Sequence, residues 1–158
     1  MEPHTLELTL PPDWDAVRTV WESCQSMLER SGLEEDEAYS LAMVAQELLE
    51  NAVKYGAADA DEIRLLLRVE DGGVTVVVRS RVGEDDTNVR AFGGAMRRIR
   101  ECPDPLAAYV ERLQQAAVRP VAAGGSELGL ARIAYEGRCA LDFTLDQGFL
   151  AVSAVYRR

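Results

Sequence analysis

The feature that most constrains the fold is a hairpin pattern near the middle of the chain. Two stretches rich in aliphatic residues, 62–70 and 74–81, are separated only by Asp71-Gly72-Gly73. A short turn with glycines between two such stretches is typical of neighbouring antiparallel strands. The rest of the chain must then supply the layer that covers this part of a sheet.

Further strands and helices are expected on both sides of this hairpin. The expected strands are 5–10, 138–145 and 149–156, and the expected helices are 13–30, 34–55, 91–101, 105–117 and 126–136. Asp13 and Asp104 are suitable N-caps, and Gly56 and Gly137 are suitable helix ends. The apolar residues expected to face inward from the helix at 105–117 are Leu106, Tyr109, Val110 and Leu113. This order predicts an α+β fold, a two-layer sandwich in which a mixed, mostly antiparallel sheet carries helices on one face.

Composition indicates one globular domain over residues 1–158 and argues against several classes of function. The hydrophobic content is 47%, and the formal net charge of −10 argues against a general nucleic-acid or membrane-surface binder. No apolar stretch approaches the roughly 20 residues of a membrane helix, and the amino terminus lacks a signal-peptide pattern. The only histidine is His4, which argues against a His-dependent triad. Cys24, Cys102 and Cys139 are widely spaced and are expected to be reduced thiols in a cytoplasmic protein.

Two tryptophans lie seven residues apart on the expected helix at 13–30. Trp14 and Trp21 are expected to be core or dimer-interface residues rather than a stacking platform.

The segment QELLENAVKYG, residues 46–56, carries the most informative polar pattern. On a helix, Glu47, Asn51 and Lys54 fall within an arc of roughly 60°. One interpretation is the solvent-exposed side of an amphipathic helix. The other is a nucleotide site, in which a carboxylate acts as general base, an amide oxygen binds Mg²⁺ and a lysine contacts phosphate. Spacing alone leaves both interpretations open.

A second segment, GGSELGL at residues 124–130, supplies what a phosphate site also needs. A glycine-bearing loop that leads into a helix presents backbone N–H groups and the positive end of the helix dipole to an anion. Small residues are common at helix starts, so this segment gains weight only in combination with residues 46–56.

Together these two segments resemble a known family. QELLENAVKYG resembles the N box of the Bergerat-fold (GHKL, histidine-kinase-like) ATPases, and GGSELGLARI resembles their later glycine box. The amino-terminal third is most similar to anti-sigma factors that are serine/threonine kinases in bacterial partner switching. The resemblance implies a small cytoplasmic protein, in some cases a homodimer, that uses ATP and Mg²⁺. Its implied partners are a small STAS-like antagonist protein, which it phosphorylates, and a sigma factor.

The resemblance assigns roles to individual residues. It implies that Glu47 is the general base, that Asn51 binds the Mg²⁺ that bridges the phosphates, and that Lys54 contacts phosphate. It also implies that Gly125, Ser126, Leu128 and Gly129 form the phosphate-side loop and helix start. Phosphoryl transfer depends mostly on positioning and charge neutralisation, so this short set of groups is sufficient chemistry.

The sequence departs from the family pattern in one place. The first glycine box, Asp-x-Gly-x-Gly, is expected near residues 79–83, where this chain has RSRVG. Arg79 stands where the adenine-binding aspartate would be, and an arginine cannot accept a hydrogen bond. The following stretch, about 83–125, is too long for a simple loop and is expected to be a lid or a partner-binding insert. It includes Arg90, Arg97, Arg98 and Arg100, which form either a solvated helix face or a contact for phosphate or an acidic partner.

Two functions therefore remain open at this point. The first is an ATP- and Mg²⁺-dependent serine/threonine protein kinase that acts on a small regulatory protein. The second is a non-catalytic switch protein of the same fold, which acts through protein binding after loss or alteration of ATP binding.

Overall fold

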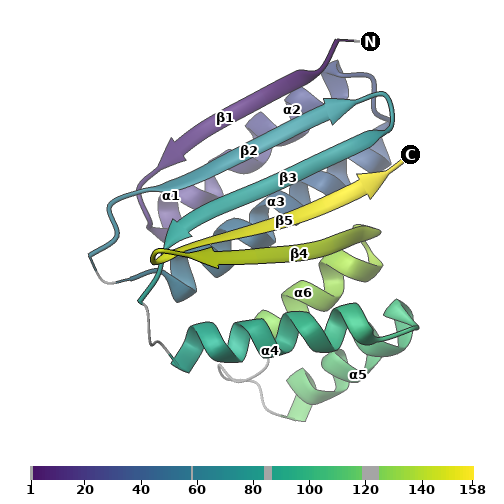
Figure 1. The fold of residues 1–158 in the computed structure, drawn as a ribbon. Coiled ribbons are helices and arrows are strands. Elements are labelled where there is room, and N and C mark those ends of the chain that lie inside the picture. Colours follow the sequence, from purple (N-terminus) through teal and green to yellow (C-terminus); the bar gives the residue numbers. More distant parts are fainter. Residues whose placement is uncertain (1, 58, 84–86, 119–124) are drawn as a thin grey trace.

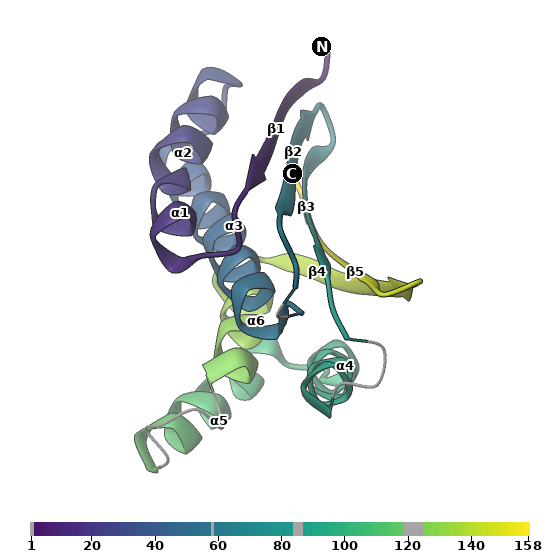
Figure 2. The same ribbon diagram turned by 90° about the vertical axis from the view of Figure 1, so that its left-hand side faces the viewer.

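The fold has two layers, a five-stranded sheet and a group of helices (Figures 1 and 2). The computed structural model describes residues 2–57, 59–83, 87–118 and 125–158. The strands are β1 (His4–Leu10), β2 (Ile63–Glu70), β3 (Gly73–Arg81), β4 (Cys139–Asp146) and β5 (Phe149–Arg157), in the spatial order β1-β2-β3-β5-β4. All four pairings are antiparallel, which confirms the predicted α+β sandwich and its mostly antiparallel sheet.

Both predicted hairpins form, and their turns use the residues that tight turns require. Gly73 begins β3 with a φ of +155°, and a Cβ atom there would lie 2.0 Å from the carbonyl oxygen of Tyr156. Only glycine fits this close approach between β3 and β5. In the second hairpin, Gln147 and Gly148 both have positive φ values, 52° and 79°, as a two-residue hairpin turn demands.

Strict alternation along the central strands separates the two faces of the sheet. On β3, the buried residues are Val74, Val76, Val78 and Ser80, which face the helices. The residues between them point to the opposite face, which none of the helices in the described part of the chain covers (Figure 2). This open face is turned toward the viewer in Figure 1.

The helical layer is centred on α3 (Glu35–Tyr55), which runs along the covered face of the sheet. Glu34 and Glu37 form a reciprocal capping box at its start, and Gly56 is its C-cap, close to the predicted limits of 34–55. The chain before it was expected to form one helix at 13–30. The structure instead has α1 (Trp14–Arg18) and α2 (Val20–Arg30), which are separated at Thr19. The Thr19 hydroxyl donates to the carbonyl of Ala16 at 2.8 Å, a local bond that competes with a continuous helix.

The stretch expected to be an insert contains two helices, α4 (Thr87–Glu101) and α5 (Pro105–Val118). α4 begins four residues before the predicted start at 91 and lies along the edge strand β4 (Figure 1), where Arg100 pairs with Asp142 at 3.1 Å. α5 begins as predicted, with Asp104 accepting from the backbone N–H groups of Leu106 and Ala107.

The predicted inward face of α5 is wrong. Leu106, Val110 and Leu113 are 47%, 42% and 43% exposed, and of the four expected residues only Tyr109 is half-buried. α5 extends away from the sheet (Figure 2) and packs against α6 (Gly125–Tyr135), so one neighbouring helix covers only part of its surface. Leu106, Val110 and Leu113 therefore remain in contact with water.

The remaining sequence predictions meet mixed outcomes. Trp21 is half-buried, with its ring centroid 5.2 Å from that of Tyr39, whereas Trp14 is 46% exposed and does not belong to the core. The three cysteines are free, and burial raises the pKa of Cys24 to about 11 and that of Cys139 to about 12. Within the described residues, none of the helices has the length and apolar character to span a membrane.

Candidate functional site

Glu47, Asn51 and Lys54 form a polar stripe along α3 that runs from the protein interior to the surface. The side chain of Glu47 is 19% exposed, Asn51 is 8% exposed, and Lys54 is exposed. Met43 and Val44, which flank the stripe one turn earlier, are buried. A solvent-exposed helix face would have left Glu47 and Asn51 in water, so that interpretation of the stripe is wrong for these two residues.

Glu47 faces α6, the helix that carries the later glycine segment. Its Oε1 lies 3.3 Å from Nη1 of Arg132. Burial raises the pKa of Glu47, and the neighbouring Glu50 raises it further, whereas Arg132 lowers it. The net direction is upward, so the loss of solvation outweighs the single long contact with the guanidinium. A carboxylate with a raised pKa is a stronger proton acceptor than an exposed one.

Arg132 connects Glu47 to the helix α5. Its Nε donates to Glu136 at 2.7 Å, and the hydroxyl of Tyr109 on α5 donates to the same carboxylate at 2.9 Å. The hydrogen bond from Arg132 lowers the pKa of Glu136. The sequence reasoning missed Arg132, whose contact with Glu47 spans 85 positions of the chain.

Gly129 allows α6 to approach Glu47. A Cβ atom at this position would lie 2.6 Å from Oε2 of Glu47, closer than any ordinary contact. One oxygen of the carboxylate is thus held by Arg132 and the other faces the backbone of α6. Of the four predicted glycine-box residues, Gly129 is the one that the structure brings directly to Glu47.

Gly125, Ser126 and Leu128 lie in the first turn of α6, as the sequence predicted for a helix that starts here. The helix begins at Gly125, one residue earlier than expected. The side chains of Ser126 and Leu128 lie outside the described part of the structure, as do residues 119–124 of the preceding loop.

Asn51 has a buried amide that lacks a partner. Within the described residues, its Nδ2 is shielded from water and donates no hydrogen bond. A buried polar group without a partner costs free energy, which is the usual mark of a position that a ligand or an ordered water completes. Rotation of the amide about its terminal bond brings Oδ1 to the same place, so the group fits a hard cation as well as a hydrogen-bonded ligand.

No acidic cluster supports a cation independently of this amide. The described residues contain no group of three or more His, Cys, Asp or Glu side chains arranged to hold a metal. Mg²⁺ commonly takes only one or two oxygens from a protein and the rest from phosphates and water. A magnesium ion at this site would therefore depend on Asn51 and on the phosphates of a bound nucleotide.

Lys54 lies one turn further along α3 and is exposed. Its Nζ is 5.8 Å from the centroid of the Tyr55 ring, and no carboxylate partner is found for it in the described part of the chain. The lysine is therefore available to an anionic ligand at the surface end of the stripe.

The sequence comparison placed Arg79 at the position of the adenine-binding aspartate, but at the end of β3 the side chain of Arg79 does not face the helices. Arg79 and Arg81 point to the open face of the sheet, where Arg79 stacks on Phe149 at 4.4 Å and Arg81 pairs with Asp59 at 3.2 Å. The side chain that faces the helices is Ser80, which is 4% exposed. A serine hydroxyl both donates and accepts hydrogen bonds, so the residue at the inward position is polar, although it carries no charge.

With this geometry in place, the chain can be assigned to a class. It belongs to the histidine kinase-like ATPase domain family, whose model matches residues 10–129. The matched region includes Glu47, Asn51, Lys54 and Gly129. A search of curated protein sequences returned no significant match.

Solved structures of two bacterial proteins show the same fold. A chain of the SiaB–SiaC complex from Pseudomonas aeruginosa is 20% identical, with a TM-score of 0.71 over 96% of this chain and 89% of that one. The RsbU and RsbW domains of a Mycobacterium tuberculosis protein are 17% identical, with a TM-score of 0.59 over 98% of this chain. This chain covers only 32% of the mycobacterial one, so that likeness concerns one part of a longer protein.

Proposed function

We propose that this chain is an ATP- and Mg²⁺-binding regulator of bacterial partner-switching signalling, with serine/threonine protein kinase activity toward a small regulatory protein. The observation that carries the proposal is the buried pair Glu47 and Asn51 on α3, opposite Gly129. Family membership supports ATP binding, and the likeness to a chain of the SiaB–SiaC complex and to the RsbU and RsbW domains supports a role in partner switching.

Each predicted residue has a role in this proposal. Asn51 would contribute the protein oxygen to Mg²⁺, and Lys54 would contact a phosphate from the exposed end of α3. The backbone at the start of α6 would hold the remaining phosphate oxygens at the positive end of the helix dipole. Glu47 would accept the proton of the substrate hydroxyl as its oxygen bonds to the terminal phosphorus of ATP, and ADP would leave with the electron pair of the broken P–O bond.

Arg132 is a positioning residue in this scheme. It holds Oε1 of Glu47 at 3.3 Å and is itself held by Glu136 at 2.7 Å. Its positive charge favours the ionised form of Glu47, which burial opposes. The base therefore remains deprotonated at a lower pH than the buried site alone would permit.

The segment at about 83–125 is the proposed lid or partner-binding insert. It contributes α4 and α5, and the exposed apolar residues Leu106, Val110 and Leu113 of α5 support a protein contact there. The proposed partners are a STAS-like antagonist protein or a sigma factor, and a homodimer is compatible with the scheme. The proposed location is the cytoplasm.

The alternative is a non-catalytic switch protein in which ATP use is lost or altered. The observation in its favour is the inward position at the end of β3, where Ser80 offers no carboxylate to an adenine amino group. Under this alternative, the chain acts by protein binding alone.

The deciding experiment measures nucleotide binding and turnover separately. Purified protein is incubated with Mg-ATP, and ADP formation and phosphate transfer to added protein are compared for wild type, Glu47→Gln and the matched control Glu50→Gln. The kinase proposal expects binding in all three proteins and turnover in wild type and Glu50→Gln only. Binding without turnover in wild type establishes the non-catalytic alternative, and equal turnover by Glu47→Gln removes Glu47 as the base.

A further inference from the structure

The open face of the sheet carries two arginines in an unfavourable arrangement. Arg64 on β2 and Arg79 on β3 are direct partners in the antiparallel register. Side chains that lie directly opposite are close enough for like charges to destabilise the sheet. The chain has a formal net charge of −10, so surplus positive charge does not force this placement.

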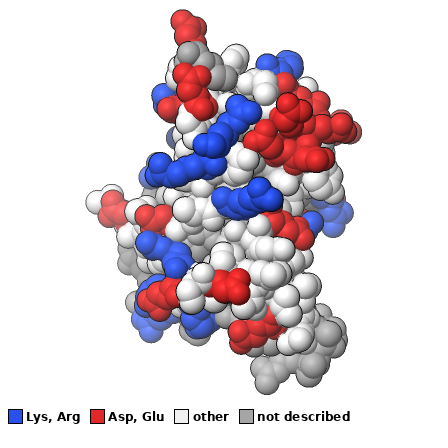
Figure 3. All heavy atoms as spheres, turned by 90° about the vertical axis from the view of Figure 1, so that its right-hand side faces the viewer, with Lys and Arg blue, Asp and Glu red and all other residues white. Residues whose placement is uncertain are grey.

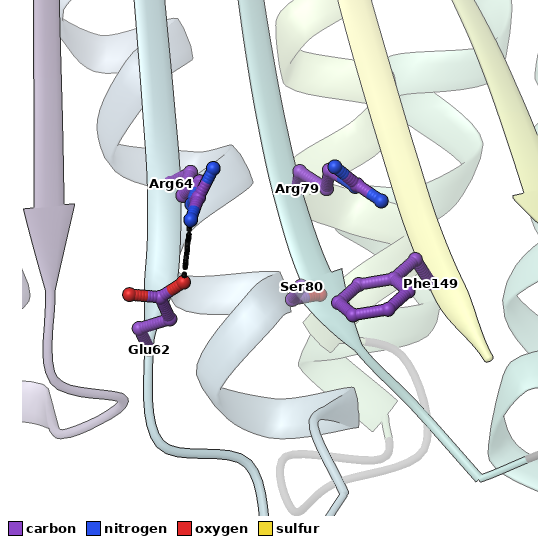
Figure 4. Close-up of a pocket in the computed structure, with 5 residues that line it drawn as sticks. All are labelled: Glu62, Arg64, Arg79, Ser80 and Phe149. Carbon is purple, nitrogen blue, oxygen red and sulfur yellow. Dashed lines mark hydrogen bonds and ion pairs between the residues drawn. The ribbon is translucent and has the colours of Figure 1, made fainter.

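The two arginines differ in how their charge is compensated. Arg64 pairs with Glu62 at 3.0 Å, and 62% of its side chain is exposed. Arg79 lies over the ring of Phe149 at 4.4 Å, and no carboxylate pairs with it among the described residues. Figure 4 shows the Arg64–Glu62 pair and the Arg79–Phe149 stack on opposite sides of one hollow, with both guanidinium groups beside it.

Two adjoining hollows share this pair of arginines. The first, of about 110 Å³, lies between Glu62, Arg64, Arg79, Ser80 and Phe149. The second, of about 290 Å³, continues toward β1, and its floor includes the half-buried Leu66 and Val77. Glu7 borders the far side of the second hollow. The first hollow thus offers one guanidinium without a carboxylate partner, that of Arg79, and the second offers an apolar floor with an acidic far edge.

The two hollows together specify the chemistry of a ligand. The first has room for a carboxylate, and a guanidinium binds this group through charge-assisted hydrogen bonds. The second has room for an aliphatic side chain a few ångströms away. An extended protein segment with an acidic residue next to an aliphatic one can place its carboxylate in the first hollow and its aliphatic side chain in the second. A polyanion such as nucleic acid fits poorly, because its row of charges would meet Glu7, Glu62 and the net negative charge of the chain, whereas a single carboxylate can contact Arg79 alone.

We propose that the open sheet face at Arg64 and Arg79 is a docking surface for an acidic, aliphatic segment of a partner protein. A second copy of this chain is a poor occupant through the same face, since a two-fold contact would bring the arginine pairs together. Figure 3 shows one group of Asp and Glu side chains at the upper right, whereas acidic and basic side chains lie next to one another over much of the rest of that view; the first turn of α3 contains three acids.

This docking surface is independent of the proposed nucleotide site. Arg64 and Arg79 lie on the face of the sheet opposite the helices, whereas Glu47 lies between α3 and α6. Substitution at Glu47 should leave binding at the open face unchanged.

The test uses a blocked pentapeptide of alternating glutamate and leucine as the probe, with the glutamine–leucine peptide as its control. Titrations of the full chain are followed by the NMR signals of the arginine Nε–H groups and of the Phe149 ring. Wild type should bind the acidic peptide at least about fivefold more tightly than the glutamine peptide. Arg79→Gln should remove most of this preference, because Arg79 is the guanidinium without a carboxylate partner, and Arg64→Gln should reduce it less, because Arg64 already pairs with Glu62. The matched control is Arg68→Gln on the same face, which leaves the preference within about twofold, because Arg68 already pairs with Glu70.

Stability supplies a second readout. Arg79→Gln relieves the repulsion from Arg64 but also removes the stack on Phe149 at 4.4 Å, and the two effects are of similar size, so its melting temperature should stay within about 4 °C of wild type. A larger fall would make Arg79 a structural residue and overturn the proposal.

Three further outcomes would overturn it as well. Equal affinity for the two peptides would remove the role of charge. Inorganic phosphate that binds as tightly as the acidic peptide would make the hollow a small-anion site. A change of oligomeric state on Arg79→Gln, measured by sedimentation, would make a second copy of the chain the occupant.

Discussion

The contact between α6 and Glu47 leads to a prediction about Gly129→Ala. A Cβ atom at residue 129 would lie 2.6 Å from Oε2 of Glu47, about 1 Å short of an ordinary contact of roughly 3.5 Å. The obstructing atom is the end of a side chain, so the fold survives and the carboxylate moves. Glu47 then loses its present position against Arg132, whose nearest nitrogen is now 3.3 Å away.

Two opposing effects set the magnitude of the change in stability. Alanine is favoured over glycine inside a helix by about 1 kcal/mol. Overpacking at a filled position costs about 1–3 kcal/mol. The matched control is Gly94→Ala in α4, where the nearest atom is the end of Arg98 at 3.4 Å, and only the helical gain applies. For a chain of this size, about 1 kcal/mol corresponds to roughly 2–4 °C in melting temperature.

The assay combines thermal unfolding with an NMR titration of the Glu47 carboxyl group. Gly94→Ala should melt about 2–4 °C above wild type, and Gly129→Ala should melt at or below wild type. Loss of the Arg132 contact should raise the pKa of Glu47 further, since that guanidinium lowers it now. The reasoning is refuted if Gly129→Ala stabilises the protein as much as Gly94→Ala does and leaves the titration of Glu47 unchanged.

Three other predictions concern the base, the sheet and α5. Arg132→Gln removes the group that favours ionised Glu47, so the acid limb of the pH–rate profile for ATP turnover should move to higher pH. An unchanged profile would show that Arg132 does not affect the ionisation of Glu47. Gly73→Ala should lower the free energy of unfolding by at least about 3 kcal/mol, because its Cβ would lie 2.0 Å from a backbone oxygen. Gly72→Ala has open space around the added Cβ, so its free energy of unfolding should stay within about 1 kcal/mol of wild type, and urea denaturation measures both values. Val110→Gln should change the melting temperature by less than about 2 °C, because that side chain is already 42% exposed; a larger fall would place it in a packed interface.

The parts of the fold that depend on local chemistry could be predicted from the sequence. The hairpin at Gly72 and Gly73 follows from residues next to one another, and the end of α3 follows from Gly56. The order of strands and helices then selects the sandwich. The polar stripe and the glycine segment were enough to indicate the family, because each is a short pattern of residue types.

The parts that depend on tertiary contacts could not be predicted in the same way. The apolar stripe of α5 has helical periodicity, but periodicity does not tell whether a neighbour covers it, and the exposure of Leu106 and Val110 came only from the structure. The pairing of Arg132 with Glu47 joins segments 85 residues apart. The orientation of Ser80, by contrast, could be predicted from the sequence. The alternation of Val74, Val76 and Val78 on one face of β3 places Ser80 on that same face.

The measurement that tests the central claim most directly is thermal unfolding with and without saturating Mg-ATP. A ligand at 100 times its Kd stabilises the native state by about 2.7 kcal/mol, which corresponds to a rise of roughly 5–10 °C here. The matched variant is Asn51→Ala, which removes a buried amide without a partner for its Nδ2 and should therefore melt no lower than wild type without ligand. The account predicts a large rise for wild type and a much smaller one for Asn51→Ala. A melting temperature of the wild-type protein that saturating Mg-ATP leaves unchanged would contradict it.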